Sequence, residues 1–218
     1  MGISLIFDYD GTIHDTMRIY EPALWRVFKW LEEEHEVRVP YPSRKRLASW
    51  IGMNKQEMWN AFLPGLFVEL KDKAGAMVGS YMEQAVCSRR AAWHSGIRSV
   101  LDKLKDRGCR MAVLSNCQSS YAKVNWETFS MNRWFEDFYN CESFGYVPKT
   151  QIIRQIGKKI PGPYVIIGDR KNDMECARAN DSPFIGCSYG FGMKGELVGA
   201  DVMVEKPENL LEGILKML

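Results

Sequence analysis

The chain has 218 residues, of which 46% are hydrophobic and 26% are charged, which is enough for one large domain or two small ones with a sizeable core. A formal net charge of +2 provides no broad basic surface, so we expect no nucleic-acid partner. No apolar run approaches membrane-spanning length, and we expect no membrane association.

The first predicted strand lies close to the start of the chain. It is the apolar run 5–7, and it is followed by Asp8, Tyr9, Asp10, Gly11 and Thr12. Alternate residues of an extended segment point the same way, so Asp8 and Asp10 can face one small volume. Two carboxylates at such a short distance repel each other, so a cation lies between them or one of them holds a proton. A hard cation with oxygen ligands is the preferred interpretation.

The two residues after the acids extend this pattern. Gly11 permits a turn that other residues adopt only with strain. Thr12 adds a hydroxyl where a phosphate or a metal-bound water can lie.

Residues 15–88 show helical patterns and no convincing strand, which predicts an all-helical insertion. Apolar residues recur at helical spacing from Met17 to Leu31, with Pro22 either opening the regular helix or kinking it. Ser43 is a predicted cap of a short helix that contains Leu47 and Trp50.

Two further helices complete the insertion. Asn54 and Glu57 form a capping-box pattern before one of them, and a long amphipathic helix follows from Leu66 to Ala85. Gly75 and Gly79 in the long helix cost about 1 kcal/mol each in helix propensity, which close packing against a neighbouring helix or a ligand can offset. We favour close packing.

After a return linker at 88–94, Ser95 is a predicted cap of a helix that ends at Gly108. Strands and helices then alternate, which is typical of a parallel sheet with helices on both faces. The predicted strands are 110–114, 135–139, 164–167, 184–187 and 201–204, and the predicted helices are 119–131, 150–160, 172–180 and 207–218. We therefore expect an α/β core, Rossmann-like, from 1–14 and 89–218, interrupted by a helical domain at 15–88.

Polar residues follow the later strands as well. Ser115 and Asn116 end one strand and can hold phosphate oxygens without adding charge. Lys149 precedes a helix and can place an ammonium near an anion. Another strand leads into Asp169 and Asp173. The carboxyl ends of parallel strands converge, so these groups are expected at one ligand-binding edge.

These motifs together resemble those of the haloacid dehalogenase superfamily, in its phosphoglycolate phosphatase-like branch with a helical cap. The first motif corresponds to residues 8–12, the second to Ser115, the third to Lys149, and the fourth to residues 168–169 with Asp173. Residues 188–192 and 199–201 resemble that branch too.

The resemblance implies a phosphatase that acts on a small phosphorylated metabolite. It implies that Asp8 is the nucleophile, that Asp10 is the general acid and base, and that Gly11, Thr12, Ser115, Asn116 and Lys149 contact the phosphate. It further implies Mg²⁺ held by Asp8, the main-chain carbonyl of Asp10 and Asp169, with Asp173 as a ligand or a supporting partner.

Other activities of similar proteins remain open. A sugar-phosphate mutase would need a phosphorylated activator, and many such mutases have Val where this chain has Thr12, which favours hydrolysis. A non-catalytic protein that binds a phosphorylated ligand would gain nothing from Asp10. The phosphonate-cleaving branch needs a Schiff-base lysine, and nothing marks Lys29 or Lys55 for that role. Residues 93–96 lack the proline often found there in the phosphatase branch.

Substrate specificity is expected from residues of the helical insertion. The candidates are Arg18, Trp50, Met53 and Lys55. The six cysteines form no Cys-x-x-Cys pair and no zinc-type cluster, and the first strand leaves no room for a signal peptide, so we expect a cytoplasmic protein with reduced thiols. The sequence does not determine whether the protein is a monomer or a dimer.

Overall fold

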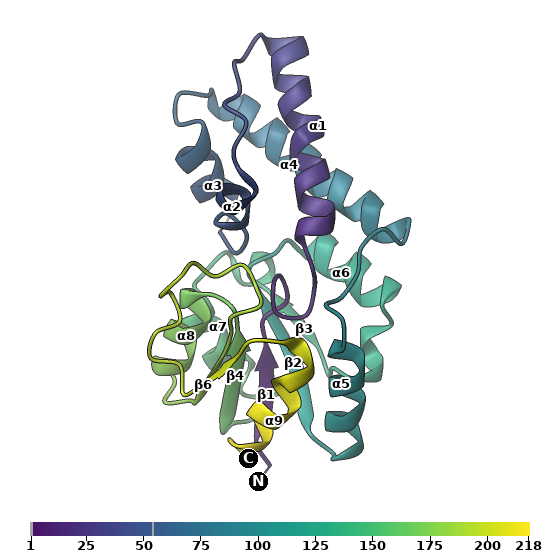
Figure 1. Ribbon diagram of the computed structural model, residues 1–218, viewed down its shortest axis with the longest axis vertical. Helices are drawn as coiled ribbons and strands as arrows, with labels where there is room; N and C mark the ends of the chain where they lie inside the picture. The colour runs from purple at the N-terminus through teal and green to yellow at the C-terminus, as the bar shows by residue number, and fades with distance from the viewer. Residues whose placement is uncertain (1, 54) are drawn as a thin grey trace.

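The computed structural model describes residues 2–53 and 55–218. A parallel sheet of six strands has the order β3-β2-β1-β4-β5-β6, and helices α1 to α4 lie beyond its carboxyl edge (Figure 1). The strands are β1 (Ser4–Phe7), β2 (Arg110–Ser115), β3 (Phe138–Asn140), β4 (Tyr164–Gly168), β5 (Phe184–Cys187) and β6 (Val202–Val204). The predicted α/β fold with a Rossmann-like parallel sheet is confirmed.

Strand β1 lies in the centre of the sheet because it is apolar on both faces. Its residues pair in register with β2 and β4, so that Phe7 lies between Val113 and Ile167. Leu5 and Phe7 point to one face and Ile6 to the other, as the two-residue period of a strand requires. A strand buried on both faces can hold the residues that follow it in a fixed position.

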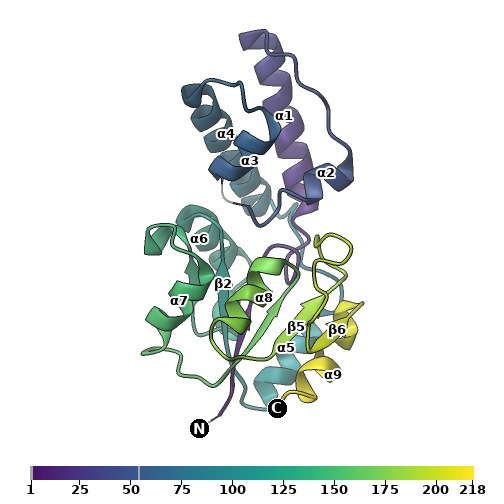
Figure 2. The same cartoon turned by 90° about the vertical axis from the view of Figure 1, so that its left-hand side faces the viewer.

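Helices cover both faces of the sheet. One face packs against α5 (Ile97–Asp106), α6 (Ser119–Thr128) and α9 (Leu210–Leu215), and the other face packs against α7 (Lys149–Ile156) and α8 (Lys171–Arg178). The two views show these layers below the insertion, with both chain ends at the opposite end of the molecule (Figures 1 and 2).

The insertion has a hydrophobic cluster of its own, distinct from the two clusters beside the sheet. It consists of α1 (Met17–His35), α2 (Arg44–Ala48), α3 (Lys55–Phe62) and α4 (Val68–Cys87). Helices α1 and α4 pack against each other, and α4 also contacts α6 of the core. None of the helices in the described part of the chain is long and apolar enough to cross a membrane.

Several predicted boundaries need correction. The third strand was expected at 135–139 but begins at Phe138, because the short 3₁₀ helix Met131–Arg133 precedes it and the Phe135 ring packs edge-on against Phe7 at 5.8 Å. The other strands agree to within one residue. Helix α6 ends at Thr128 rather than at 131, since Ser130 has a φ of +53°.

The remaining corrections concern helix ends. Helix α5 is preceded by Gly96, with a φ of +85°, and not capped by Ser95. Helix α7 ends at Ile156, before Gly157, and the last segment divides into the 3₁₀ helix Pro207–Asn209 and α9. The Oγ of Ser43 accepts from the N–H of Arg46, as expected for a cap. Pro22 lies inside α1, and Asn54 of the predicted capping box lies outside the described residues.

Candidate active site

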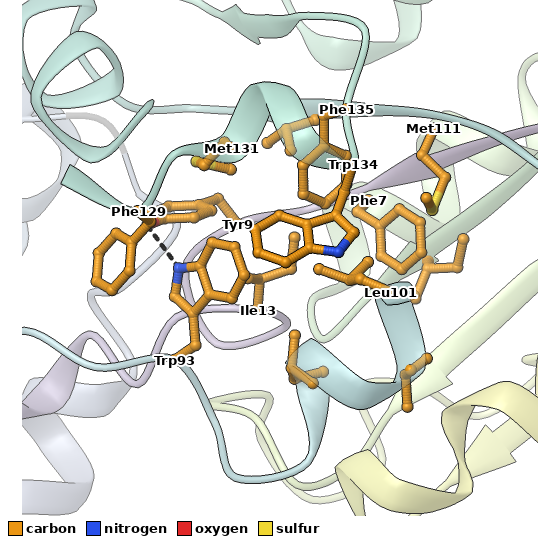
Figure 3. Close-up of a cluster of buried hydrophobic side chains, with 14 of the residues drawn as sticks. Phe7, Tyr9, Ile13, Trp93, Leu101, Met111, Phe129, Met131, Trp134 and Phe135 are labelled. Carbon is orange, nitrogen blue, oxygen red and sulfur yellow. Dashed lines mark hydrogen bonds between the residues drawn. The ribbon is translucent and has the colours of Figure 1, made fainter. Parts of the chain in front are cut away.

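Asp8 and Asp10 follow β1 directly, and the residue between them anchors the segment. The ring of Tyr9 is fully buried; its hydroxyl donates to Oδ1 of Asn125 at 2.7 Å and accepts from Nε1 of Trp93 at 3.2 Å. Figure 3 shows Tyr9 among the core side chains beside Trp93 and Phe129. Because successive side chains of an extended segment alternate, this burial of Tyr9 fixes both acids on the opposite side.

Lys149, at the start of α7, joins two of the predicted acids. Its Nζ donates to Oδ1 of Asp8 at 2.5 Å and to Oδ1 of Asp173 at 2.7 Å, and all three side chains are buried. The other oxygen of Asp173 accepts the backbone N–H of Arg170 at 3.1 Å. Asp173 therefore holds both the ammonium of Lys149 and the first turn of α8 in position.

Asp169 completes a cluster of buried carboxylates. Oxygens of Asp8, Asp169 and Asp173 lie within 4.8 Å of one another. The Oδ2 of Asp169 accepts the backbone N–H of Phe191 at 2.6 Å. Gly11 has a φ of +101°, and a Cβ there would lie 2.2 Å from Oδ2 of Asp169, so only glycine allows this approach.

The cluster contains more negative than positive groups. Burial, together with the carboxylate of Asp173, raises the pKa of Asp8 to about 7 despite the opposing effect of Lys149. Burial and the charges of Asp8 and Asp173 raise the pKa of Asp169 well above its ordinary value. Burial alone would lower the pKa of Lys149, but Asp173 and Asp8 outweigh it and raise that pKa. Three carboxylates around one ammonium favour the binding of a further cation.

The residues also suit a divalent metal chemically. The cluster offers carboxylate oxygens, which are the preferred ligands of hard cations such as Mg²⁺.

Asp10 is held by three residues for which the sequence predicted no role. The hydroxyls of Thr16 and Tyr121 donate to its Oδ1 at 2.6 and 3.2 Å. His14 is fully buried, its Nδ1 lies 2.8 Å from Oγ1 of Thr16, and its ring stacks on Tyr9. Asp10 is thus held in one orientation at the junction of the core and the insertion.

Two adjoining cavities meet at Asp10. The small cavity, about 90 Å³, is lined by Asp8, Asp10, Gly52, Met53, Ser115, Asn116, Cys117, Arg170 and Asn172. The large cavity, about 490 Å³, lies between the insertion and the core and shares Asp10, Gly52, Met53, Asn116 and Cys117 with the small one. Asp10 therefore lies at the boundary between a small cavity beside Asp8 and a large cavity beneath the insertion.

The loop at 49–53, here called the cap loop, is bonded to the core from both sides of the small cavity. Nδ2 of Asn116 donates to the main-chain oxygen of Gly52 at 3.1 Å. The guanidinium of Arg170 donates to the main-chain oxygen of Ile51, and its Nε donates to Glu196 at 2.8 Å. The cap loop is therefore closed over the small cavity in this structure.

The structure brings the predicted site residues to one edge of the sheet, but Gly11, Thr12 and Lys149 do not line the small cavity. The Thr12 hydroxyl is buried, 3.5 Å from Oδ1 of Asp169, and the Ser115 hydroxyl lies 3.5 Å from Oδ2 of Asp10. Asn116 lines the small cavity but gives one N–H to the cap loop.

The specificity candidates divide into three cases. Trp50 and Met53 line the large cavity. Arg18 is exposed and lines neither cavity, and the side chain of Lys55 lies outside the described part of the chain. Lys29 is exposed on α1 and pairs with Glu33.

Residues 5–187 match the model of the haloacid dehalogenase-like hydrolase family. The chain belongs to this family, which confirms the resemblance drawn from the four motifs. It is similar to a 5'-nucleotidase of Pseudomonas aeruginosa, with 25% identity over 206 residues that cover 89% of this chain and 86% of the relative.

Solved structures share the whole fold. A predicted phosphoglycolate phosphatase from Haemophilus somnus has a TM-score of 0.82 at 18% identity, with 96% of each chain covered. A predicted phosphatase from Clostridium acetobutylicum has a TM-score of 0.79 at 24% identity, with 98% of each chain covered. CbbY from Rhodobacter sphaeroides, solved with phosphate, has a TM-score of 0.76 at 19% identity, with 96% of each covered.

Proposed function

We propose that this protein is a Mg²⁺-dependent phosphatase that hydrolyses a small-molecule phosphomonoester through an aspartyl-phosphate. The observation that carries the proposal is the buried cluster in which Lys149 bridges Asp8 and Asp173, next to a small cavity that Asp10 also lines. The nucleotidase, the predicted phosphatases and the phosphate-bound CbbY among its relatives support the reaction class. Their names imply different leaving groups, so the substrate is a separate question.

In the first half of the reaction, a carboxylate oxygen of Asp8 attacks phosphorus and the bond from phosphorus to the ester oxygen breaks. Asp10 donates its proton to that oxygen, so the product leaves as an alcohol. In the second half, Asp10 takes a proton from water, and the water oxygen attacks the phosphorus bound to Asp8. The bond between phosphorus and the Asp8 oxygen breaks, inorganic phosphate leaves, and both aspartates return to their starting states.

The remaining residues position and neutralise the phosphoryl group. Lys149 fixes Asp8, and Ser115 and Asn116 line the small cavity with uncharged hydrogen-bonding groups. Asp8, the Asp10 carbonyl and Asp169 would hold Mg²⁺, and Asp173, whose oxygens already accept from Lys149 and Arg170, would support them. When bound, Mg²⁺ supplies charge neutralisation at the transferring phosphoryl oxygens.

We also propose that residues 15–88 are a cap domain on two hinges, with the core formed by 1–14 and 89–218. The chain passes between the core and the insertion twice, near residue 14 and near residue 93, and these two segments are hydrogen-bonded to each other. The N–H of Asp15 donates to the main-chain oxygen of Ala92 at 3.0 Å, and the N–H of His94 donates to the main-chain oxygen of Ile13 at 2.9 Å. Opening of the cap would admit substrate, and closure would exclude water from phosphoryl transfer. The six cysteines are all free thiols in this structure, which leads us to propose the cytoplasm as its location.

The proposal is tested by phosphate release from a broad phosphoester panel, with Mg²⁺ or with EDTA. Release that needs Mg²⁺ and is lost in Asp8→Asn is the expected result. A mutase would instead depend on a phosphorylated activator, and a binding protein would hold a phosphate analogue without turnover. Either of these outcomes would contradict the proposal.

A further inference from the structure

One segment of the core contacts both aspartate motifs and the insertion. It comes shortly after β5 and is here called the 189–196 segment. The hydroxyl of Tyr189 donates to the main-chain oxygen of Thr12 at 2.8 Å. The backbone N–H of Phe191 donates to Oδ2 of Asp169 at 2.6 Å, and its ring packs against the hydrophobic cluster of the insertion. The 189–196 segment is therefore in a position to connect the insertion with the acid cluster.

Two glycines allow this segment to lie directly against Asp169. A Cβ at Gly190 would lie 2.4 Å from Oδ2 of Asp169, and a Cβ at Gly192 would lie 2.3 Å from the main-chain oxygen of Asp169. A larger residue at either position would move the segment away from the acid cluster. The path of the chain toward Glu196 is thus fixed by its contact with Asp169.

The segment ends in a turn that holds the carboxylate of Glu196. The N–H of Glu196 donates to the main-chain oxygen of Met193 at 2.9 Å, and the N–H of Met193 donates to Oε2 of Glu196 at 2.6 Å. Gly195, with a φ of +84°, permits this turn. Oε1 of Glu196 accepts the N–H of Lys171, the first residue of α8, at 2.9 Å. Two backbone groups therefore fix the carboxylate in place.

The fixed carboxylate binds the side chain of Arg170. Oε1 of Glu196 accepts from Nε of Arg170 at 2.8 Å, and the side chains of Arg170 and Glu196 are only 14% and 13% exposed. Burial alone would raise the pKa of Glu196, but the hydrogen bonds from Arg170 and from the two backbone N–H groups outweigh it and lower that pKa. Glu196 is therefore ionised at neutral pH, and its bond to Arg170 is assisted by charge.

The other end of the same guanidinium contacts the cap loop. Nη1 of Arg170 donates to the main-chain oxygen of Ile51, and Nη2 donates to that of Ser49 at 3.5 Å. A Cβ at Gly52 would lie 3.5 Å from Cγ of Arg170, so the loop also lies against the aliphatic part of this side chain. A free arginine has many rotamers. The bond from Nε to Glu196 restricts them, so the guanidinium meets the cap loop in one orientation.

We propose that Glu196 is a positioning residue of the phosphatase, which holds Arg170 in the orientation that binds the closed cap loop. Because the 189–196 segment also holds Asp169, closure of the cap is tied to the arrangement of the acid cluster. The inference rests on the proposed function in that closure serves phosphoryl transfer. The contacts that carry it do not depend on turnover.

Amide hydrogen exchange tests the contact without any substrate. Glu196→Gln keeps the size of the side chain and removes its charge. We expect residues 49–53 to exchange about 2- to 10-fold faster than in the wild type, the effect of losing one hydrogen bond, and exchange in β1 and β4 to stay unchanged. Glu212→Gln, which removes an exposed acid that pairs with Lys216, is the matched control and should exchange like the wild type.

A double variant separates the positioning of Arg170 from a general loosening of the segment. With p-nitrophenyl phosphate and Mg²⁺, we expect Glu196→Gln to raise KM about 2- to 10-fold with little change in kcat, because closure contributes to binding. If Glu196 acts through Arg170, Glu196→Gln combined with Arg170→Met should have the KM of Arg170→Met alone. A KM raised by the product of the two single effects would contradict the proposal.

The failure of this inference and the failure of the proposed function have different signs. Glu196→Asp keeps the charge but shortens the side chain by one methylene, and it should also speed exchange at 49–53 if Glu196→Gln is unstable. Wild-type exchange at these residues in the folded variants would overturn the role of Glu196 and leave the phosphatase intact. No phosphate release by the wild type would overturn the phosphatase, and the exchange result would still decide whether Glu196 positions Arg170.

Discussion

The hydroxyl of Thr16 donates a 2.6 Å hydrogen bond to Oδ1 of Asp10, so the first residue before α1 directly positions the proposed general acid. Thr16→Val keeps the shape and removes this donor. We expect kcat to fall about 10- to 100-fold, since small misplacement of a reacting group has effects of this size. Thr16→Ser should restore most of the activity. A pH profile of kcat that is the same in Thr16→Val and wild type, with no loss of rate, would contradict this role.

The cap loop provides a second prediction. Arg170→Met removes the bonds from the guanidinium to the main-chain oxygens of Ser49 and Ile51. We expect faster amide hydrogen exchange at residues 49–53 and a KM raised about tenfold, equivalent to about 1.4 kcal/mol of lost binding. Arg178→Met, which removes an exposed arginine at the far end of α8, is the control and should leave that exchange unchanged.

Binding of a phosphate mimic should also change the cap loop. Tungstate should protect residues 49–53 from exchange in the wild type and less so in Arg170→Met. If protection is the same with and without tungstate, and crystals with and without it have the same cap position, closure on hinges is wrong.

Metal selectivity follows from the small number of carboxylates at the site. Mg²⁺ prefers octahedral coordination completed by water and substrate, whereas Ca²⁺ takes six to eight oxygens at longer distances. Ca²⁺ would draw Asp8 toward bidentate binding, which is unsuited to in-line attack. We expect activity with Mg²⁺ and none with Ca²⁺ in a phosphate-release assay. Full activity in EDTA would refute the metal assignment.

The pH dependence of stability should report the buried acids in the metal-free protein. The folded-state pKa of Asp8, about 7, exceeds its ordinary value of 3.8, so the folded state binds this proton more tightly than the unfolded state. Its contribution to the free energy of unfolding is present below about pH 4 and is lost as the pH rises through 7.

Urea unfolding at pH 5 and pH 8 in EDTA measures this effect. From pH 5 to pH 8 the wild type should lose about 1 to 3 kcal/mol more than Asp8→Asn, given about 1.4 kcal/mol per pKa unit. Mg²⁺ should stabilise the wild type more at pH 8 than at pH 5, because deprotonated acids bind it. If the free energy of unfolding changes equally with pH in the wild type and in Asp8→Asn, the pKa of Asp8 is not raised in the folded protein.

The sequence predicted the sheet and the convergence of four motifs because both depend on local patterns. Apolar runs define the strands, and parallel strands bring Asp8, Ser115 and Asp169 to one edge regardless of their separation in the chain. Lys149 was found because it precedes a predicted helix. These features require no knowledge of how the cap packs.

Some residues of the site could not be predicted from the sequence, because their roles depend on contacts across the junction between the core and the insertion. Tyr121 has the spacing of an ordinary core aromatic on α6, and only the tertiary fold brings its hydroxyl to Asp10. Arg170 lies inside the fourth motif, but its bond to the cap loop depends on cap position. For His14 and Thr16, the one indication of a role in the site was that they lie only a few residues after the first motif in the sequence.

We propose that Asp8 becomes phosphorylated and that Asp10 transfers the protons. Asp10→Asn leaves Asp8 able to attack, but an alkoxide must then leave without a proton, which costs about 10²- to 10⁴-fold in rate. A nitrophenolate leaving group needs no such proton. Asp10→Asn should therefore lose far more activity on a sugar phosphate than in the first turnover on p-nitrophenyl phosphate.

The most direct measurement is a rapid-quench burst of Asp10→Asn on p-nitrophenyl phosphate at neutral pH, followed by intact-protein mass spectrometry. We predict one burst of nitrophenolate and accumulation of protein with one added phosphoryl group, since no base remains to activate water. Asp8→Asn should show neither turnover nor label. Equal losses on both substrates with no trapped phosphoprotein would contradict the role of Asp10, and wild-type activity in Asp8→Asn would contradict the covalent mechanism.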